Sequence, residues 1–111
     1  MCGIYGCIAE EAAGKVLDGL RKLEYRGYDS AGLAAIFSDS DIQIETERTT
    51  GYVSDLVNKA NGRFDGSRIS IGHTRWATHG GVTDENAHPH SSEDGKITIV
   101  HNGIIENSVE L

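Results

Sequence analysis

The spacing of apolar residues predicts a strand followed by a helix at the start of the chain. Residues 2–9 (CGIYGCIA) form a short apolar run that is typical of a strand buried on both faces. Residues 10–25 place Val16, Leu20 and Leu23 three or four positions apart, with charged residues between them. That period is typical of an amphipathic helix, so we expect a helix over 10–25.

A hairpin and a second helix are predicted next. Residues 31–37 (AGLAAIF) are apolar, and residues 42–48 (IQIETER) alternate apolar and polar side chains as a half-buried strand does. The polar residues 38–41 (SDSD) between them predict the turn. Residues 53–60 again have apolar side chains at helical spacing, which predicts a second helix.

One long polar segment dominates the second half of the chain. Strands are predicted at 68–74 (RISIGHT) and at 96–103 (KITIVHNG), and residues 75–95 between them carry no regular pattern. Loops longer than about 12–15 residues inside a compact domain are usually functional or disordered. This loop contains Trp76 and three histidines, so we favour a functional loop.

Length and charge limit the classes of protein that the chain can represent. At 111 residues it forms one domain at most, and its net charge of −7 argues against binding to nucleic acid or to an anionic membrane surface. Neither a secretory signal nor a membrane-spanning segment is visible, so we expect a cytoplasmic protein. A further helix starting near Asn107 or Ser108 has no room before Leu111, which suggests a piece of a longer protein.

Two cysteines near the start raise the question of a nucleophile. A strand over residues 2–9 would put Cys2 and Cys7 on opposite faces, with their Cα atoms about 16 Å apart, too far for a disulfide. Loss of Met1 would leave Cys2 with a thiol and a primary amine side by side, and such an amine can serve as the base for its own nucleophile. The alternative is an ordinary buried strand cysteine, and the position alone leaves both interpretations open.

Asn102 and Gly103 lie at the end of the last predicted strand and could supply hydrogen-bond donors. The side-chain amide of Asn102 and the backbone N–H of Gly103 suit the stabilisation of an oxyanion in acyl transfer. Glycine lets the backbone approach a ligand closely because it has no Cβ. A plain Asn-Gly turn is the alternative, since this dipeptide is frequent in turns.

The segment GHTRWATHGG (72–81) offers groups for a carboxylate ligand. Arg75 has a planar guanidinium fork that matches a carboxylate, and Thr78 and His79 add polar contacts, a set that suits an amino acid. In the alternative interpretation the segment is a surface loop in which Arg75 forms a salt bridge and Trp76 fills the core.

The five histidines raise the possibility of a metal site. His88 and His90 form an H-x-H pair, and a zinc site that adds a cysteine is conceivable. Their spacing matches no common zinc pattern, and they flank the only proline, Pro89, which favours a rigid loop. We therefore predict no metal ligands and no cofactor.

Taken together, these segments resemble a known family. The glutaminase domain of the glutamine–fructose-6-phosphate aminotransferases, which are class II glutamine amidotransferases, has similar motifs in this order and at about this spacing: MCGIYG, LRKLEYRGYDSAGLA, GHTRWATHG, NAHPH and VHNGIIEN. RGYDS and WATHG distinguish this branch from the amidophosphoribosyltransferases. The resemblance implies an α+β Ntn-hydrolase fold, an αββα sandwich of two stacked antiparallel sheets flanked by helices, of which residues 1–111 are only the first part.

The resemblance also implies which residues carry out the chemistry. Cys2 matches the nucleophile that attacks the glutamine side-chain amide, and its freed amine matches the base. Asn102 and Gly103 match the oxyanion hole. Arg26, in the RGYDS motif, matches a residue that supports the catalytic cysteine.

A second set of residues matches the glutamine pocket of the family. Arg75 matches the residue that binds the α-carboxylate of glutamine, and Trp76, Thr78 and His79 line that pocket. His88 matches a loop position near the interface with the sugar domain.

The activity that the resemblance implies is hydrolysis of L-glutamine to supply ammonia. A C-terminal sugar isomerase domain, absent from these residues, then converts fructose-6-phosphate to glucosamine-6-phosphate. The acidic residue that binds the ammonium group of glutamine also lies beyond Leu111 in the family. We therefore expect the 111 residues alone to show little glutaminase activity, and the full-length protein to be a homo-oligomer.

Two other functions are left open by the residues themselves. A non-catalytic oligomerising or regulatory piece of the same scaffold would keep Met1, since a blocked amine would cost it nothing. A histidine-rich metal-binding module would bind stoichiometric zinc and lose its structure when a chelator removes the metal.

Overall fold

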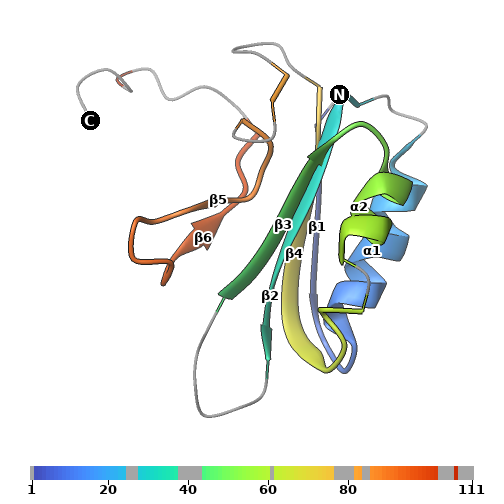
Figure 1. The fold of residues 1–111 in the computed structure, drawn as a ribbon, viewed down its shortest axis with the longest axis vertical. Helices are drawn as coiled ribbons and strands as arrows, with labels where there is room; N and C mark the ends of the chain where they lie inside the picture. The colour runs from blue at the N-terminus through green and yellow to red at the C-terminus, as the bar shows by residue number, and fades with distance from the viewer. Residues whose placement is uncertain are drawn as a thin grey trace.

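The computed structural model describes residues 2–24, 28–37, 44–60, 62–76, 82–83, 86–102 and 107. These ranges contain six strands and two helices, whose arrangement Figure 1 shows. In chain order they are β1 (Gly3–Ile8), α1 (Ala12–Lys22), β2 (Ser30–Phe37), β3 (Ile44–Thr50), α2 (Val53–Ala60), β4 (Ser67–Arg75), β5 (His90–Ser91) and β6 (Thr98–Ile99).

The first four strands along the chain form one antiparallel sheet in the order β1-β4-β2-β3. β4 pairs with both β1 and β2, so that Thr74 lies opposite Gly3 on one side and opposite Ala31 on the other. β5 and β6 pair as a separate two-stranded antiparallel sheet. The first strand and the strand just before the long polar segment are thereby neighbours.

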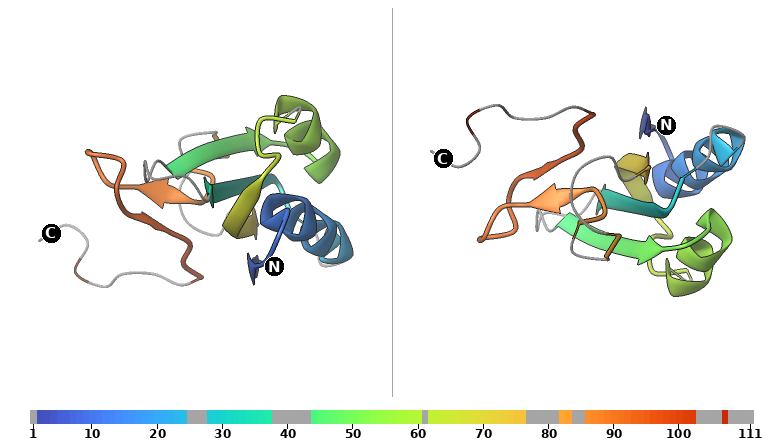
Figure 2. Two further views of the ribbon diagram at one scale, coloured as in Figure 1. Left: turned by 90° about the horizontal axis from the view of Figure 1, so that it is seen from below. Right: turned by 90° about the horizontal axis from the view of Figure 1, so that it is seen from above.

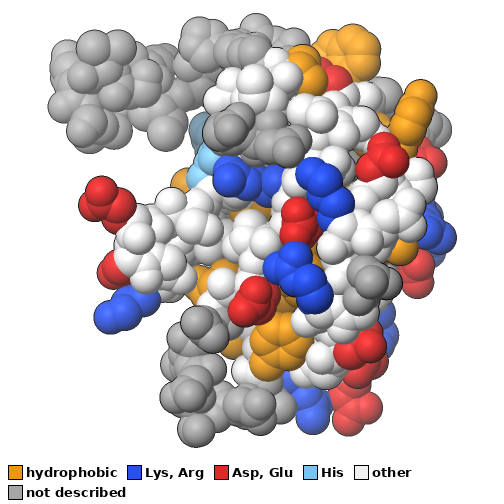
Figure 3. Space-filling view, in the orientation of Figure 1, with side chains coloured by type: hydrophobic (Ala, Val, Ile, Leu, Met, Phe, Trp, Pro, Cys, Tyr) orange, Lys and Arg blue, Asp and Glu red, His pale blue; other side chains and the backbone are white. Residues whose placement is uncertain are grey.

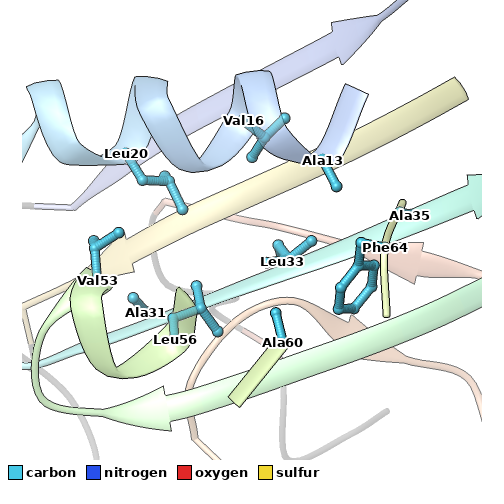
Figure 4. Close-up of a cluster of buried hydrophobic side chains, with 10 residues drawn as sticks. All are labelled: Ala13, Val16, Leu20, Ala31, Leu33, Ala35, Val53, Leu56, Ala60 and Phe64. Atoms are coloured by element: carbon cyan, nitrogen blue, oxygen red, sulfur yellow. The ribbon is translucent and has the colours of Figure 1, made fainter. Parts of the chain in front are cut away.

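Both described helices lie on the same face of the four-stranded sheet, and the β5–β6 hairpin lies beyond the other face (Figure 2). The core fills the space between helices and sheet, as the close-up in Figure 4 shows. Its buried side chains come from α1, β2, α2 and the turn that follows α2: Ala13, Val16, Leu20, Ala31, Leu33, Ala35, Val53, Leu56, Ala60 and Phe64. Burial of these side chains is the main term that holds the helices to the sheet.

A glycine in β4 allows α1 to lie close to the sheet. A Cβ on Gly72 would come within 2.5 Å of Val16 Cγ1 and 3.0 Å of Leu20 Cδ1. Real Cβ atoms do not approach neighbours this closely, so a larger residue would push the helix away. The helix therefore rests directly on the centre of the sheet.

The opposite face of the sheet is also apolar. Because side chains alternate along a strand, the residues between those that face the helices point the other way. Six isoleucines occupy this outer face: Ile4, Ile8, Ile36, Ile44, Ile69 and Ile71. A hollow of about 140 Å³ lies here, lined by strand residues of the sheet and by Thr98 of β6.

The first strand differs from its prediction. We expected residues 2–9 to be buried on both faces, but Ile4 is 46 % exposed and Ile8 is 82 % exposed. Among the described strands, β1 lies at the edge of its sheet and pairs with β4 alone, and its outward side chains lie on the face opposite the helices. The apolar run thus predicted the strand correctly, but the prediction that both of its faces are buried is wrong.

The remaining elements agree with the sequence pattern to different degrees. The helix predicted at 53–60 and the predicted hairpin are confirmed. The predicted strand at 96–103 is reduced to Thr98–Ile99, and the segment expected to lack regular structure contains β5. The turn predicted at 38–41 lies outside the described residues, as does the helix expected near the chain end, apart from Asn107.

Charged side chains are mixed on the face that Figure 3 shows. Lys and Arg side chains alternate with Asp and Glu over β3 and α2 and form no continuous basic patch on this face. Among the described residues, no helix is long and apolar enough to cross a membrane.

Candidate active site

Cys2 lies immediately before β1 and is half-buried. Its Sγ lies 3.7 Å from the backbone oxygen of Trp76, just past the end of β4. Cys7, five residues later, packs against the core on the helix side. Both thiols are free, which confirms that the two cysteines form no disulfide.

The sheet register puts Cys2 on the same face as two residues of β4. Gly3 pairs with Thr74, and side chains alternate in both strands, so Cys2, His73 and Arg75 all project from the face opposite the helices. Arg75 is the last residue of β4 and only 8 % exposed. The N–H of Asp29 donates to the Arg75 carbonyl at 2.7 Å, which anchors the end of the strand.

Asn102 is brought to Cys2 although the two residues are 100 positions apart. Its Nδ2 donates to the backbone oxygen of Cys2 at 3.4 Å. Its Oδ1 lies 2.6 Å from Nε2 of His73. An amide donor therefore lies next to the cysteine, as an oxyanion-stabilising group would need to be.

Three histidine rings pack together beside this amide. The His73 and His88 rings stack with centroids 4.1 Å apart, and the His88 and His90 rings lie 4.4 Å apart at an angle of 52°. The backbone N–H of His101 donates to Nδ1 of His88 at 3.3 Å. This contact leaves the hydrogen of a neutral His88 on Nε2.

The environment keeps these rings neutral at ordinary pH. Burial, together with the smaller effects of the neighbouring His73, His90 and Arg75, lowers the pKa of His88 to about 4. Burial also lowers the pKa of His73, against the hydrogen bond with Asn102, which raises it. A neutral imidazole has one donor and one acceptor, so each ring holds a defined hydrogen-bonding pattern.

The segment that carries His88 lies directly against β2. A Cβ on Gly32 would overlap the carbonyl group of His88. Arg48 of β3 also reaches this segment, with Nη1 3.4 Å from the Ala87 oxygen. Ala87 and Pro89 are buried, so residues 87–90 form a fixed layer on the outer face.

The structure brings together part of the predicted site. Asn102, Arg75 and His88 lie around His73, and Cys2 contacts Asn102. The Trp76 side chain is 50 % exposed, so the alternative in which it fills the core is wrong. Four predicted site residues lie outside the described part of the chain: Arg26, Thr78, His79 and Gly103.

His73 is the residue of this site that the sequence analysis missed. It entered that analysis only as one of five histidines in a possible metal set. The signal was available, because His73 and Arg75 lie two positions apart in a strand and must share a face. In the described ranges, no group of three His, Cys, Asp or Glu residues is arranged to hold a metal ion.

Sequence comparison shows what the whole chain is similar to. No protein-family model matches it. A glutamine–fructose-6-phosphate aminotransferase [isomerizing] of Clostridium tetani is 53 % identical over 112 aligned residues, and one of Idiomarina loihiensis is 54 % identical. The chain is similar to these aminotransferases along its whole length. Each alignment covers 100 % of this chain but only 18 % of the relative.

A solved structure supports the fold. The glutamine phosphoribosylpyrophosphate amidotransferase from B. subtilis, complexed with ADP and GMP, superposes with a TM-score of 0.60 at 26 % identity. The match covers 84 % of this chain and 19 % of that one. The two antiparallel sheets and two helices thus match the fold of Ntn-type glutamine amidotransferases, which confirms the predicted α+β class.

Proposed function

We propose that these residues form the first part of a glutaminase domain in which Cys2 hydrolyses the side-chain amide of L-glutamine. A sugar isomerase domain outside these residues would use the ammonia to convert fructose-6-phosphate to glucosamine-6-phosphate. Both reactions would take place in the cytoplasm. The observation that carries the proposal is the Asn102 amide beside Cys2, on the same face as Arg75. The similarity to the aminotransferases supports the choice of reaction.

The proposed reaction starts with removal of Met1, which frees the amine of Cys2. An α-amino group titrates near 7.7–8.0, so it can accept the thiol proton at neutral pH. The thiolate attacks the amide carbon, and the Asn102 Nδ2–H and Gly103 N–H donate to the oxyanion. Ammonia leaves with a proton from the amine, and water then hydrolyses the glutamyl thioester to glutamate.

The remaining residues bind and orient the substrate in this proposal. Arg75 pairs with the α-carboxylate of glutamine, because its planar fork matches two carboxylate oxygens. Trp76, Thr78 and His79 line the pocket around it. Arg26 supports Cys2, and His88 lies near the interface with the sugar domain.

The two cysteines offer a matched test of the nucleophile. In the full-length protein, Cys2→Ser should lower glutamate release by more than about 10³-fold, because a serine hydroxyl is far less nucleophilic than a thiolate. Cys7→Ser, on the helix side of the same strand, should retain activity close to that of the unmodified protein. Intact-mass measurement should show the loss of one methionine.

Two results would contradict the proposal. Full glutaminase activity in Cys2→Ser would exclude the thiol as nucleophile. A retained Met1 in an active protein would exclude the amine as the base. A retained Met1 in an inactive full-length protein would favour the non-catalytic scaffold instead.

A further inference from the structure

The side chain of Asn102 is an exposed amide outside any strand, so its orientation needs an explanation. The two ends of an amide have similar shape and opposite hydrogen-bonding character. In one orientation the NH₂ group faces Cys2, and in the flipped orientation the oxygen does. Only the first orientation offers a donor to an oxyanion that forms on a substrate bound at Cys2.

His73 distinguishes between these two orientations. It is fully buried in β4, and its Nε2 lies 2.6 Å from Oδ1 of Asn102. An amide oxygen only accepts hydrogen bonds, so the hydrogen of the neutral imidazole must lie on Nε2. The same contact leaves Nδ2 of Asn102 directed at Cys2, where it donates to the backbone oxygen at 3.4 Å.

The surroundings of the ring stabilise this tautomer. Nδ1 of His73 is buried and has no hydrogen-bond partner in the part of the chain that the structure describes. A hydrogen on Nδ1 would therefore be a buried donor without an acceptor, which is unfavourable. Stacking on His88 fixes the plane of the ring, and the nearby charge of Arg75 favours the neutral form.

We propose that His73 is a positioning residue that holds the Asn102 amide with its NH₂ group toward Cys2. The inference rests on the proposed glutaminase function, because it assigns the donor of that reaction a fixed orientation. His73 itself touches neither the thiol nor the substrate in this assignment. Its contribution passes through one hydrogen bond to Asn102.

Two polar substitutions at His73 separate this hydrogen bond from a general structural role. The amide nitrogen of a glutamine reaches about as far from the backbone as Nε2 of histidine, whereas that of an asparagine reaches only as far as Nδ1. In the full-length protein we expect His73→Gln to keep kcat within about tenfold of the unmodified protein. His73→Asn should lower kcat by about 10–100-fold, a part of the 10²–10³-fold that loss of one oxyanion donor costs, with KM little changed.

A double-mutant cycle tests whether His73 acts through Asn102. Asn102→Ala alone should lower kcat by about 10²–10³-fold, and adding His73→Asn should lower it no further. Alkylation of Cys2 by iodoacetamide, which needs no oxyanion donor, should proceed at the unmodified rate in every variant. His90→Gln is the control, because His90 packs against His88 without bonding to Asn102.

The outcomes distinguish failure of the inference from failure of the proposed function. Multiplicative losses in the double variant, or equal kcat in His73→Asn and the unmodified protein, would overturn the role of His73. The role of His73 would also be overturned if His73→Gln and His73→Asn lowered kcat equally while the melting temperature of both variants stayed unchanged. If Asn102→Ala keeps full activity, the oxyanion assignment of the proposed function fails instead, whatever His73 does.

Discussion

Cys2 and Asn102 lie at opposite ends of the chain, and the outward side chains of β4 connect them. His73 forms a hydrogen bond with Asn102. Arg75 projects from the same face of β4 and directly follows Thr74, the residue that pairs with Gly3. The sequence predicted Cys2, Arg75 and Asn102 because each has a side chain that suits a role in the reaction and each matches a functional position of the family that the sequence resembles. It did not predict His73, because the importance of that ring depends on a contact 29 positions away.

Arg75 allows a prediction at the scale of one side chain. Arg75→Lys in the full-length protein should raise the KM for glutamine by about 10–100-fold, because an ammonium cannot form the two parallel hydrogen bonds of a guanidinium. The effect on kcat should be smaller. Steady-state measurement of glutamate release over a range of glutamine concentrations gives both constants.

Arg68 provides the control on the same strand. Its side chain is half exposed and its Nη1 lies 3.6 Å from Glu10, a surface ion pair of small energetic weight. Arg68→Lys should leave both constants unchanged. A KM in Arg75→Lys as low as that of Arg68→Lys would exclude Arg75 as the carboxylate-binding group.

At the scale of elements, the sequence predicts local pattern well and non-local pairing poorly. The period of apolar residues in 53–60 fixes α2, whose burial depends on its own amphipathic spacing. β5 escapes prediction, and the strand predicted at 96–103 is reduced to β6. Each of these strands is two residues long and depends on the pairs His90–Ile99 and Ser91–Thr98. α1 begins at Ala12 rather than at residue 10, since Glu11 has a left-handed backbone with φ of 52°.

Gly32 is the point at which β2 meets the segment that carries His88. Gly32→Ala should displace that segment, because the added Cβ would overlap the backbone carbonyl of His88. A Cβ and a backbone carbonyl are both attached directly to the main chain, so neither can rotate away from the other. We expect a cost of about 1–3 kcal/mol in stability, measured by chemical denaturation of the full-length protein, and a reduced kcat. The loss of activity follows from the His88–His73–Asn102 contacts.

Gly14 is a matched control for that substitution. It lies in α1, and a Cβ there would have no neighbour within 4 Å. Gly14→Ala should stabilise the protein by about 0.5–1 kcal/mol, because alanine favours helix more than glycine does. Equal stability of the two variants would show that the close approach at Gly32 has no energetic weight.

At the scale of the whole molecule, the strand order β1-β4-β2-β3 decides where the site lies, and the sequence pattern does not contain it. Each strand could be recognised from its own residues, whereas the pairing of β4 with both β1 and β2 depends on contacts between distant segments. The same order puts the site residues on the outer, isoleucine-rich face. That face is partly open to solvent, with Ile69 41 % exposed and Ile8 82 % exposed.

This exposure supports a prediction for the isolated 111 residues. Donors aimed at an oxyanion stabilise it strongly only where water is excluded, since water screens charge and competes for the same hydrogen bonds. Asn102 is exposed in these residues, so we expect ammonia release from glutamine far below that of the full-length protein. The exposed isoleucines should also drive self-association, because contiguous apolar surface of this kind is seldom left uncovered.

Light scattering after size exclusion, together with an ammonia assay on the same fractions, measures both effects. Ile8→Lys places a charge at the most exposed of these isoleucines and away from the core on the helix side, so it should raise the monomer fraction. Its activity should stay as low as that of the unmodified fragment, because a monomer still has an open site. A monomeric fragment that releases ammonia at the full-length rate would contradict the argument, since an uncovered oxyanion donor would then suffice for catalysis.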